Sequence, residues 1–183
     1  LYLNDFEDLS AAGKAAYKQR TGRELDKLNH KDKKQMNEWT RMKTEQLTKV
    51  SLTLADAFKQ SRPNAVIMRD IYAEPVLDPE SEEWFAQNYQ DYLKNYNYTV
   101  VMAYPYMDGE KDPMGYLSNV AAAVKAAGGT SKTIVKIQTY DWNKERWLSR
   151  QVFNQQLQTL KKGGMLHLGY YPNTFYTWDW VRK

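Results

Sequence analysis

Three carboxylates stand within four residues near the start of the chain, at Asp5, Glu7 and Asp8. Carboxyl groups this close can shift one another's pKa, so that one keeps a proton while another stays ionised. The stretch LYLNDFEDLS that contains them begins with the alternating apolar residues of a strand. It is therefore either an ordinary exit from a strand into a loop or the rim of an active site.

Polar and aromatic residues recur at the ends of the later strands that the sequence predicts. The carboxyl ends of parallel strands build the sites of α/β proteins. Five strand ends of this composition therefore favour a functional rim over the alternative, that these residues are polar only because they are exposed to solvent. Tyr and Trp are also the side chains on which flat sugar rings stack, although half of them are expected to be core residues. The rim residues after the first strand are Arg69, Asp70, Tyr72, Tyr104, Tyr106, Asp108, Tyr140, Asp141, Trp142, Tyr170 and Tyr171.

Hydrophobic periodicity predicts an α/β fold in which strands and helices alternate. The best example is an apolar stripe at intervals of three or four residues, from Met36 to Ala57. The alternation predicts parallel strands with crossover helices, in a doubly wound sheet or a (β/α)8 barrel. We expect strands at 1–5, 65–75, 98–109, 133–142 and 164–172, and helices at 10–19, 34–60, 78–96, 113–127 and 148–162.

Several function classes are disfavoured by the composition. A net charge of +4 is not gathered into one arm, and no nucleic-acid-binding signature accompanies the basic run at 30–35, so we expect no nucleic acid partner. No Gly-rich phosphate loop follows a strand, since GGTSKT at 128–133 lies between a helix and a strand. With no Cys, and with only His30 and the expected core residue His167, we expect neither a metal site nor a cofactor.

The chain is expected to be an internal part of a longer protein. It begins with Leu rather than Met, and no signal peptide is present. No apolar run approaches the roughly 20 residues that span a bilayer.

Four stretches carry a resemblance to a known family: LNDFED (3–8), IYAEPVLDPESEEWFAQNYQDYLKNY (71–96), MAYPYMDG (102–109) and GYYPNTF (169–175). Over about residues 1 to 175 the chain is similar to the C-terminal glycoside hydrolase domain of the PgaB (HmsF) family. The resemblance implies a TIM-like (β/α)8 barrel, of which the chain supplies approximately strands 4 to 8. It implies that the family's N-terminal deacetylase domain and the first half of the barrel are absent from residues 1–183.

The resemblance also implies a function. The family acts on partially deacetylated poly-β-1,6-N-acetyl-D-glucosamine during biofilm polysaccharide export, in the periplasm and associated with the outer membrane, where an export porin is the expected partner. An endo-acting glycosidase is the first hypothesis. A non-catalytic module that guides the polymer to the pore is the alternative, and an inactive structural fragment is the third. Because half of the barrel mouth would be missing, we expect residues 1–183 alone to show little turnover, and the open sheet edges to invite association.

Residue roles follow from the resemblance and from glycosidase chemistry. A protonated carboxyl group must donate to the leaving oxygen, while a second carboxylate or a substrate group meets the charge at the anomeric carbon. The resemblance places the catalytic Asp at Asp5, with Glu7 as a possible support; Asp8 is better explained as a helix cap. The partner carboxylate is expected upstream, so a retaining or inverting outcome stays open.

The remaining rim residues are assigned to substrate binding. Deacetylated units carry an ammonium group, which Asp70, Asp108 and Asp141 would attract. For Arg69 and Asp70 an internal ion pair is an equally good explanation.

Overall fold

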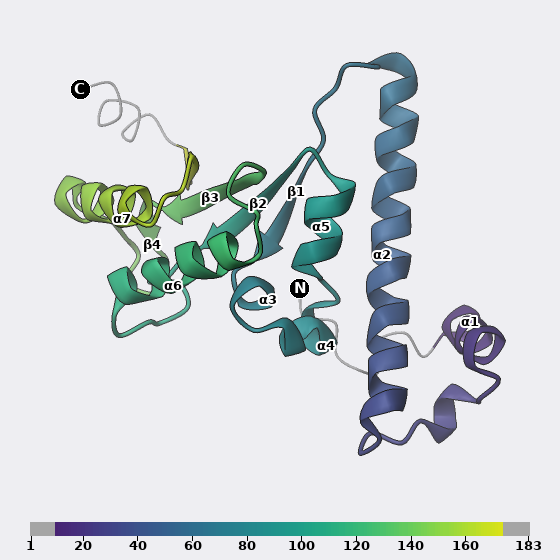
Figure 1. The fold of residues 1–183 in the computed structure, drawn as a ribbon. Coiled ribbons are helices and arrows are strands. Elements are labelled where there is room, and N and C mark those ends of the chain that lie inside the picture. Colours follow the sequence, from purple (N-terminus) through teal and green to yellow (C-terminus); the bar gives the residue numbers. More distant parts are fainter. Residues whose placement is uncertain (1–9, 174–183) are drawn as a thin grey trace. The chain divides into compact units, whose positions relative to one another are not determined.

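The computed structural model describes residues 10–173 (Figure 1). These residues fall into two compact units, residues 10–65 with Asp78–Asn88, and Val66–Leu77 with residues 89–173. The first expected strand, at 1–5, lies outside the described residues. Within the described part of the chain, no helix is both long and apolar enough to cross a membrane.

The first unit is built around one long helix. Its core joins Tyr17 to Trp39, whose rings meet edge to face with centroids 5.7 Å apart. Local signals set the helix ends: the Ser10 hydroxyl accepts a hydrogen bond from the Gly13 N–H, and Gly22 ends the first helix in the left-handed conformation, with φ of 72°. The elements are α1 (Ala11–Thr21), η1 (Leu25–Lys27), α2 (Lys33–Ser61), η2 (Pro79–Ser81) and α4 (Glu82–Phe85).

The apolar stripe on α2 divides into a buried and an exposed half. Met36 and Trp39 lie in the core of the unit, and the buried Lys43 ammonium donates to the Glu83 carbonyl at 3.0 Å. Farther along, Leu54 is 66% exposed. The expected bounds of this helix are confirmed to within one residue, but its apolar stripe is buried only over the first half.

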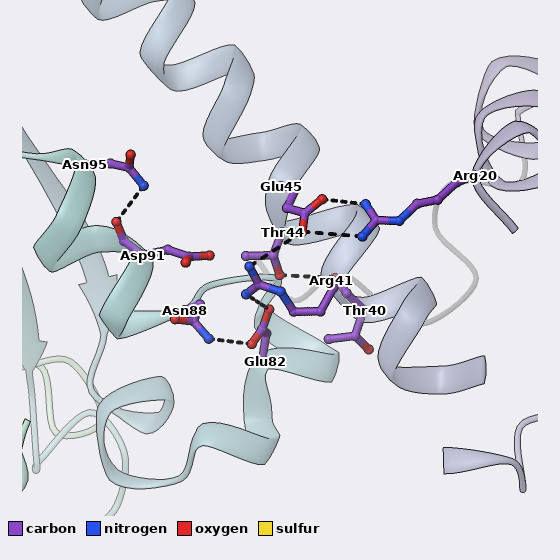
Figure 2. A network of polar contacts seen from close by, with 9 residues as sticks. All are labelled: Arg20, Thr40, Arg41, Thr44, Glu45, Glu82, Asn88, Asp91 and Asn95. Atoms are coloured by element: carbon purple, nitrogen blue, oxygen red, sulfur yellow. Dashed lines mark hydrogen bonds and ion pairs between the residues drawn. The ribbon is translucent and has the colours of Figure 1, made fainter. Parts of the chain in front are cut away.

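A polar network connects α2 to α4 in the same unit (Figure 2). Arg41 Nη1 lies 2.8 Å from Glu82 Oε1, and Asn88 donates to the other oxygen of this carboxylate at 2.7 Å. Arg41 also lies 3.7 Å from Glu45, which Arg20 of α1 contacts through both guanidinium nitrogens. The Glu82 carboxylate, which is almost fully buried, is thus compensated by a neighbouring charge.

The second unit is a four-stranded parallel sheet with helices. The strand order in space is the order along the chain, β1-β2-β3-β6, and each step is a crossover. This order lacks the reversal of a doubly wound sheet and is the arrangement found in (β/α)8 barrels. The strands are β1 (Met68–Tyr72), β2 (Tyr98–Ala103), β3 (Thr133–Gln138) and β6 (His167–Tyr171). The helices are α3 (Glu74–Leu77), α5 (Tyr89–Asn95), α6 (Pro113–Ala126) and α7 (Arg150–Lys162), and a small hairpin joins β4 (Tyr140–Asp141) to β5 (Arg146–Trp147).

The two faces of this sheet differ in burial. One face carries fully buried residues, such as Ile71, Val101 and Ile137, and is covered by helices, with α6 and α7 side by side (Figure 1). The residues that alternate with them, among them Asp70 and Lys136, remain partly or largely exposed in the structure, apart from Gln138 at the end of β3. Successive residues along each strand therefore alternate between the helix-covered face and the open face of the sheet.

Several expected elements differ from their predicted bounds, and the strand expected at 65–75 covers only Met68–Tyr72. The helix expected at 78–96 is broken, because Ala86 adopts a left-handed conformation (φ of 47°) between α4 and α5. Trp84, expected on its buried face, is 50% exposed. The strand expected at 98–109 ends at Ala103, just before a turn that contains Pro105, which has no N–H to donate. The strand expected at 133–142 ends at Gln138, after which the chain enters the hairpin.

Candidate functional site

The loops at the carboxyl ends of β2 and β3 are held together by one buried side chain. Gln138 Oε1 accepts hydrogen bonds from the N–H groups of Tyr106 at 2.8 Å and Met107 at 3.1 Å. Its Nε2 donates to the Tyr140 carbonyl at 2.7 Å. Gln138 is fully buried, so it orders both loops from beneath. Sequence analysis missed this residue; the available signal was a polar side chain at the end of an apolar strand.

The hairpin that follows is fixed by its own polar residues. Asp141 is 2% exposed, and its Oδ1 accepts from the N–H groups of Asn143 and Lys144, both at 3.1 Å. Asn143 in turn donates to the Tyr106 carbonyl at 2.7 Å. The sequence predicts that the Asp141 carboxylate faces an ammonium group of the substrate. In the structure this carboxylate instead accepts hydrogen bonds within a turn of the protein.

Four of the predicted rim aromatics form one cluster around Trp142. Its ring stacks on Tyr171 with centroids 6.1 Å apart and an interplanar angle of 21°. Tyr104 and Tyr140 each lie 5.8 Å from it, and Trp147 extends the cluster at 5.0 Å from Tyr140. Tyr171 is 52% exposed and Trp147 37%, so the cluster presents aromatic surface. The structure brings these residues together from three strand ends, as the sequence predicts.

Asp70 and Lys136 form an ion pair on the open face of the sheet, next to this cluster. Lys136 Nζ lies 2.7 Å from Asp70 Oδ1 and 5.9 Å from the Tyr171 ring centroid. Burial raises the pKa of Tyr104, and the negative charge of Asp70 acts in the same direction. Asp70 thus makes an internal ion pair, but with Lys136 rather than with Arg69.

Two predicted site residues lie on the helix-covered face instead. The Arg69 guanidinium stacks over the Tyr92 ring at 4.6 Å and donates to the Tyr96 hydroxyl at 2.7 Å. The ring of Tyr170 packs against Phe153 of α7 at 5.9 Å. Strand alternation separates both from the Trp142 cluster, and these contacts favour a packing role for them.

The loop after β2 carries another predicted carboxylate. The Tyr116 hydroxyl donates to Asp108 Oδ2 at 3.0 Å. Burial raises the pKa of Asp108, while this hydrogen bond acts to lower it. Burial likewise raises the pKa of Tyr106 in the same loop.

Other predicted residues complete the description. Tyr72 ends β1 on the same side of the strand as Asp70, half-buried. His167, expected in the core, is partly exposed and meets Tyr98 edge to face at 5.4 Å. Asp5 and Glu7 lie outside the described residues. Within residues 10–173, no three His, Asp or Glu side chains are placed to hold a metal ion.

Parallel strands in barrel order, with an aromatic cluster at their carboxyl ends, are the arrangement of (β/α)8 barrel proteins, whose sites lie at that end of the strands. Residues 1–171 match the family described as hypothetical glycosyl hydrolase family 13, and the chain belongs to this family. Two curated relatives, the poly-beta-1,6-N-acetyl-D-glucosamine N-deacetylases of Escherichia coli K12 and O157:H7, are each 35% identical over 180 residues. The match covers 94% of this chain and 27% of each relative.

A solved structure agrees with these relationships. The PgaB (BpsB) glycoside hydrolase domain from Bordetella bronchiseptica superposes with a TM-score of 0.88 at 29% identity, over 99% of this chain and 50% of that chain. The resemblance to this domain and the prediction of a TIM-like (β/α)8 barrel are confirmed. The chain spans about half the length of the solved domain and about a quarter of the curated relatives.

Proposed function

We propose that the chain forms part of a glycoside hydrolase domain that binds and cleaves partially deacetylated poly-β-1,6-N-acetyl-D-glucosamine. The observation that carries the proposal is the Trp142 cluster, which offers exposed aromatic surface at the strand ends of a member of a glycosyl hydrolase family. Aromatic faces suit the apolar faces of sugar rings. The substrate is suggested by the printed name of the Escherichia coli relatives.

The proposed chemistry assigns proton transfer and sugar binding to different residues. A protonated Asp5 donates its proton to the glycosidic oxygen as the bond to the anomeric carbon breaks, and Glu7 supports it. A second carboxylate or a group on the substrate meets the positive charge that develops, and water completes the hydrolysis. The cluster around Trp142, with Tyr104 and Tyr171, holds the sugar chain in register for an internal, endo-acting cut.

The biological setting belongs to the same proposal. We place the protein in the periplasm, associated with the outer membrane, where it would process the biofilm polymer before an export porin receives it.

A second candidate function is polymer binding without cleavage. The observation that favours it is that three rim carboxylates already have internal partners: Asp70 with Lys136, Asp108 with Tyr116, and Asp141 with turn N–H groups. The described part of the rim is therefore suited to holding a sugar chain, and proton transfer depends on Asp5.

The test is digestion of the polymer by the full glycoside hydrolase domain of which this chain forms a part, with product lengths read by mass spectrometry. Asp5→Asn should abolish shortening of the polymer and leave binding intact, while Asp8→Asn, at the expected helix cap, should still cleave. Unimpaired cleavage by Asp5→Asn would overturn the catalytic assignment. Binding without cleavage by the unmodified protein would support the binding module instead.

A further inference from the structure

Lys136 is a positive charge placed beside the exposed end of the Trp142 cluster. Its Nζ lies 5.9 Å from the Tyr171 ring centroid, and the side chain is only 20% exposed. A sugar unit held on the exposed surface of Trp142 and Tyr171 would lie within reach of this ammonium group. A partly buried charge at that distance is only weakly screened by salt, so it acts on whatever binds there.

The residue opposite Lys136 on the neighbouring strand is small. The register partner of Lys136 in β6 is Gly169, which has no side chain. A Cβ at Gly169 would make ordinary van der Waals contacts, at 3.5 Å from Ile134 Cγ2 and 3.8 Å from Lys136 Cγ. Directly opposite the lysine, β6 thus contributes backbone only, and its nearby side chain is the Tyr171 ring.

The ammonium group keeps hydrogen-bonding capacity for a ligand. A lysine has three N–H donors, and Asp70 Oδ1 accepts one of them at 2.7 Å. Among residues 10–173 no other hydrogen-bond acceptor contacts Lys136 Nζ. The Asp70 charge is correspondingly compensated and is a poor attractor for a second cation. A neutral carbonyl oxygen suits the remaining donors, whereas another ammonium would be repelled.

We propose that Lys136 determines the acetylation state accepted at the subsite formed by Trp142 and Tyr171. This subsite takes an N-acetylglucosamine unit, whose acetyl oxygen accepts a hydrogen bond from Lys136, and disfavours a glucosamine unit with its ammonium group. The assignment rests on the function proposed above and names a specificity residue within the same site. It reverses the expectation that Asp70 recruits the deacetylated unit.

The test compares two ligands of equal length, a β-1,6-linked N-acetylglucosamine pentamer and the corresponding glucosamine pentamer, by isothermal titration calorimetry at low salt. Lys136→Met keeps the length of the side chain and removes its charge, so it should shift the affinity ratio toward the glucosamine pentamer by at least fivefold. Asp70→Asn removes the compensating charge and should shift the ratio the other way. Lys136→Arg should keep the unmodified preference. Lys125→Met, an exposed lysine on α6, is the matched control and should change nothing.

The outcomes are distinguishable. Opposite shifts in Lys136→Met and Asp70→Asn support the proposal. Equal weakening of both pentamers in both variants would show that the ion pair only maintains structure, and would overturn it. If Lys136→Met loses its folded circular dichroism spectrum, an unchanged ratio in Asp70→Asn overturns it instead. Failure of the unmodified protein to bind either pentamer would contradict the proposed function itself, and the specificity assignment with it.

Discussion

Lys136 on β3 reaches across strand β2 to place its ammonium group 2.7 Å from the carboxylate of Asp70 on β1. The pair stands on the open face of the sheet, while Ile71 and Ile137, the neighbours of these two residues in the chain, are buried on the other face. From the sequence, the Asp70 carboxylate is expected to attract cations. In the structure its charge is compensated by Lys136. Charge at this part of the rim is set by the pair rather than by Asp70 alone.

The stacking role of Trp142 can be tested by truncation. Trp142→Ala removes the ring that contacts Tyr171 and Tyr104, and should weaken binding of the N-acetylglucosamine pentamer by about tenfold, or about 1.4 kcal/mol. Trp142→Phe should recover part of this loss. Trp84→Ala removes a 50% exposed tryptophan of the other unit and is the control for calorimetry. Equal affinities for Trp142→Ala and the unmodified protein would exclude the cluster from the site.

The buried Gln138 side chain should matter for stability as well as for binding. Gln138→Ala leaves the N–H groups of Tyr106 and Met107 without their acceptor, which should lower the free energy of unfolding by about 2–3 kcal/mol. Urea denaturation measures this loss. Gln158→Ala, at an exposed position on α7, should stay within about 0.5 kcal/mol of the unmodified protein. A Gln138 variant as stable as that control would show that the loops do not depend on this residue.

The buried charge in the first unit predicts a large effect from a single substitution. Arg41→Met leaves the Glu82 carboxylate without its guanidinium partner and should cost about 3 kcal/mol of stability. Adding Glu82→Gln should recover part of the loss, because the uncompensated charge is then gone. Arg20→Met breaks the more exposed contact with Glu45 and should cost at most about 1 kcal/mol. Similar losses in the two single variants, measured by urea denaturation, would contradict this difference in burial.

Alkaline pH should destabilise the second unit through its buried tyrosines. Burial raises the pKa of Tyr92 to about 12 from an ordinary value of 10.0, although the charge of Arg69 opposes the shift. The unfolded chain then releases this proton at lower pH than the folded one. Stability therefore holds below about pH 10 and falls as the pH rises through 10 to 12.

The matching variant is Tyr92→Phe. The buried Tyr92 hydroxyl has no hydrogen-bond partner among residues 10–173, so the variant should be more stable at pH 7, by about 1 kcal/mol. It should also lose less stability above pH 10. Denaturation curves from pH 7 to 11.5 measure both effects, and a steeper alkaline loss in Tyr92→Phe than in the unmodified protein would contradict them.

Apart from the broken helix at 78–96, helices were more predictable than strand ends, for a physical reason. Helix signals are local: Asp112 and Ser149 cap α6 and α7, and the apolar spacing of these helices is readable from neighbouring residues. The strand at 98–109 was predicted too long because Tyr104 and Tyr106 have strand-like composition. In the structure the Tyr106 N–H instead donates to Gln138, more than 30 residues away, a contact that the local sequence does not reveal.

The sequence predicted which aromatic residues gather at the candidate site, but not which face of the sheet each neighbouring residue occupies or which charged residues pair. Strand ends indicated that Tyr104, Tyr140, Trp142 and Tyr171 would gather, and the structure brings them together. Which face Arg69 or Tyr170 would occupy depends on the start and register of each strand, which composition does not set. Asp70 and Lys136 are 66 positions apart in the chain, and no local sequence pattern indicates that they pair. The assignment of Asp5 stays a prediction.

The most direct measurement of the central claim is an NMR titration of the tryptophan indole N–H signals with the N-acetylglucosamine pentamer. Signals are assigned by single Trp→Phe variants. If the sugar site lies at the carboxyl ends of the parallel strands, the Trp142 and Trp147 signals shift on saturation, while Trp39, buried in the core of the first unit, does not. Shifts confined to Trp39 or Trp84, with Trp142 and Trp147 unmoved at saturation, would contradict the account.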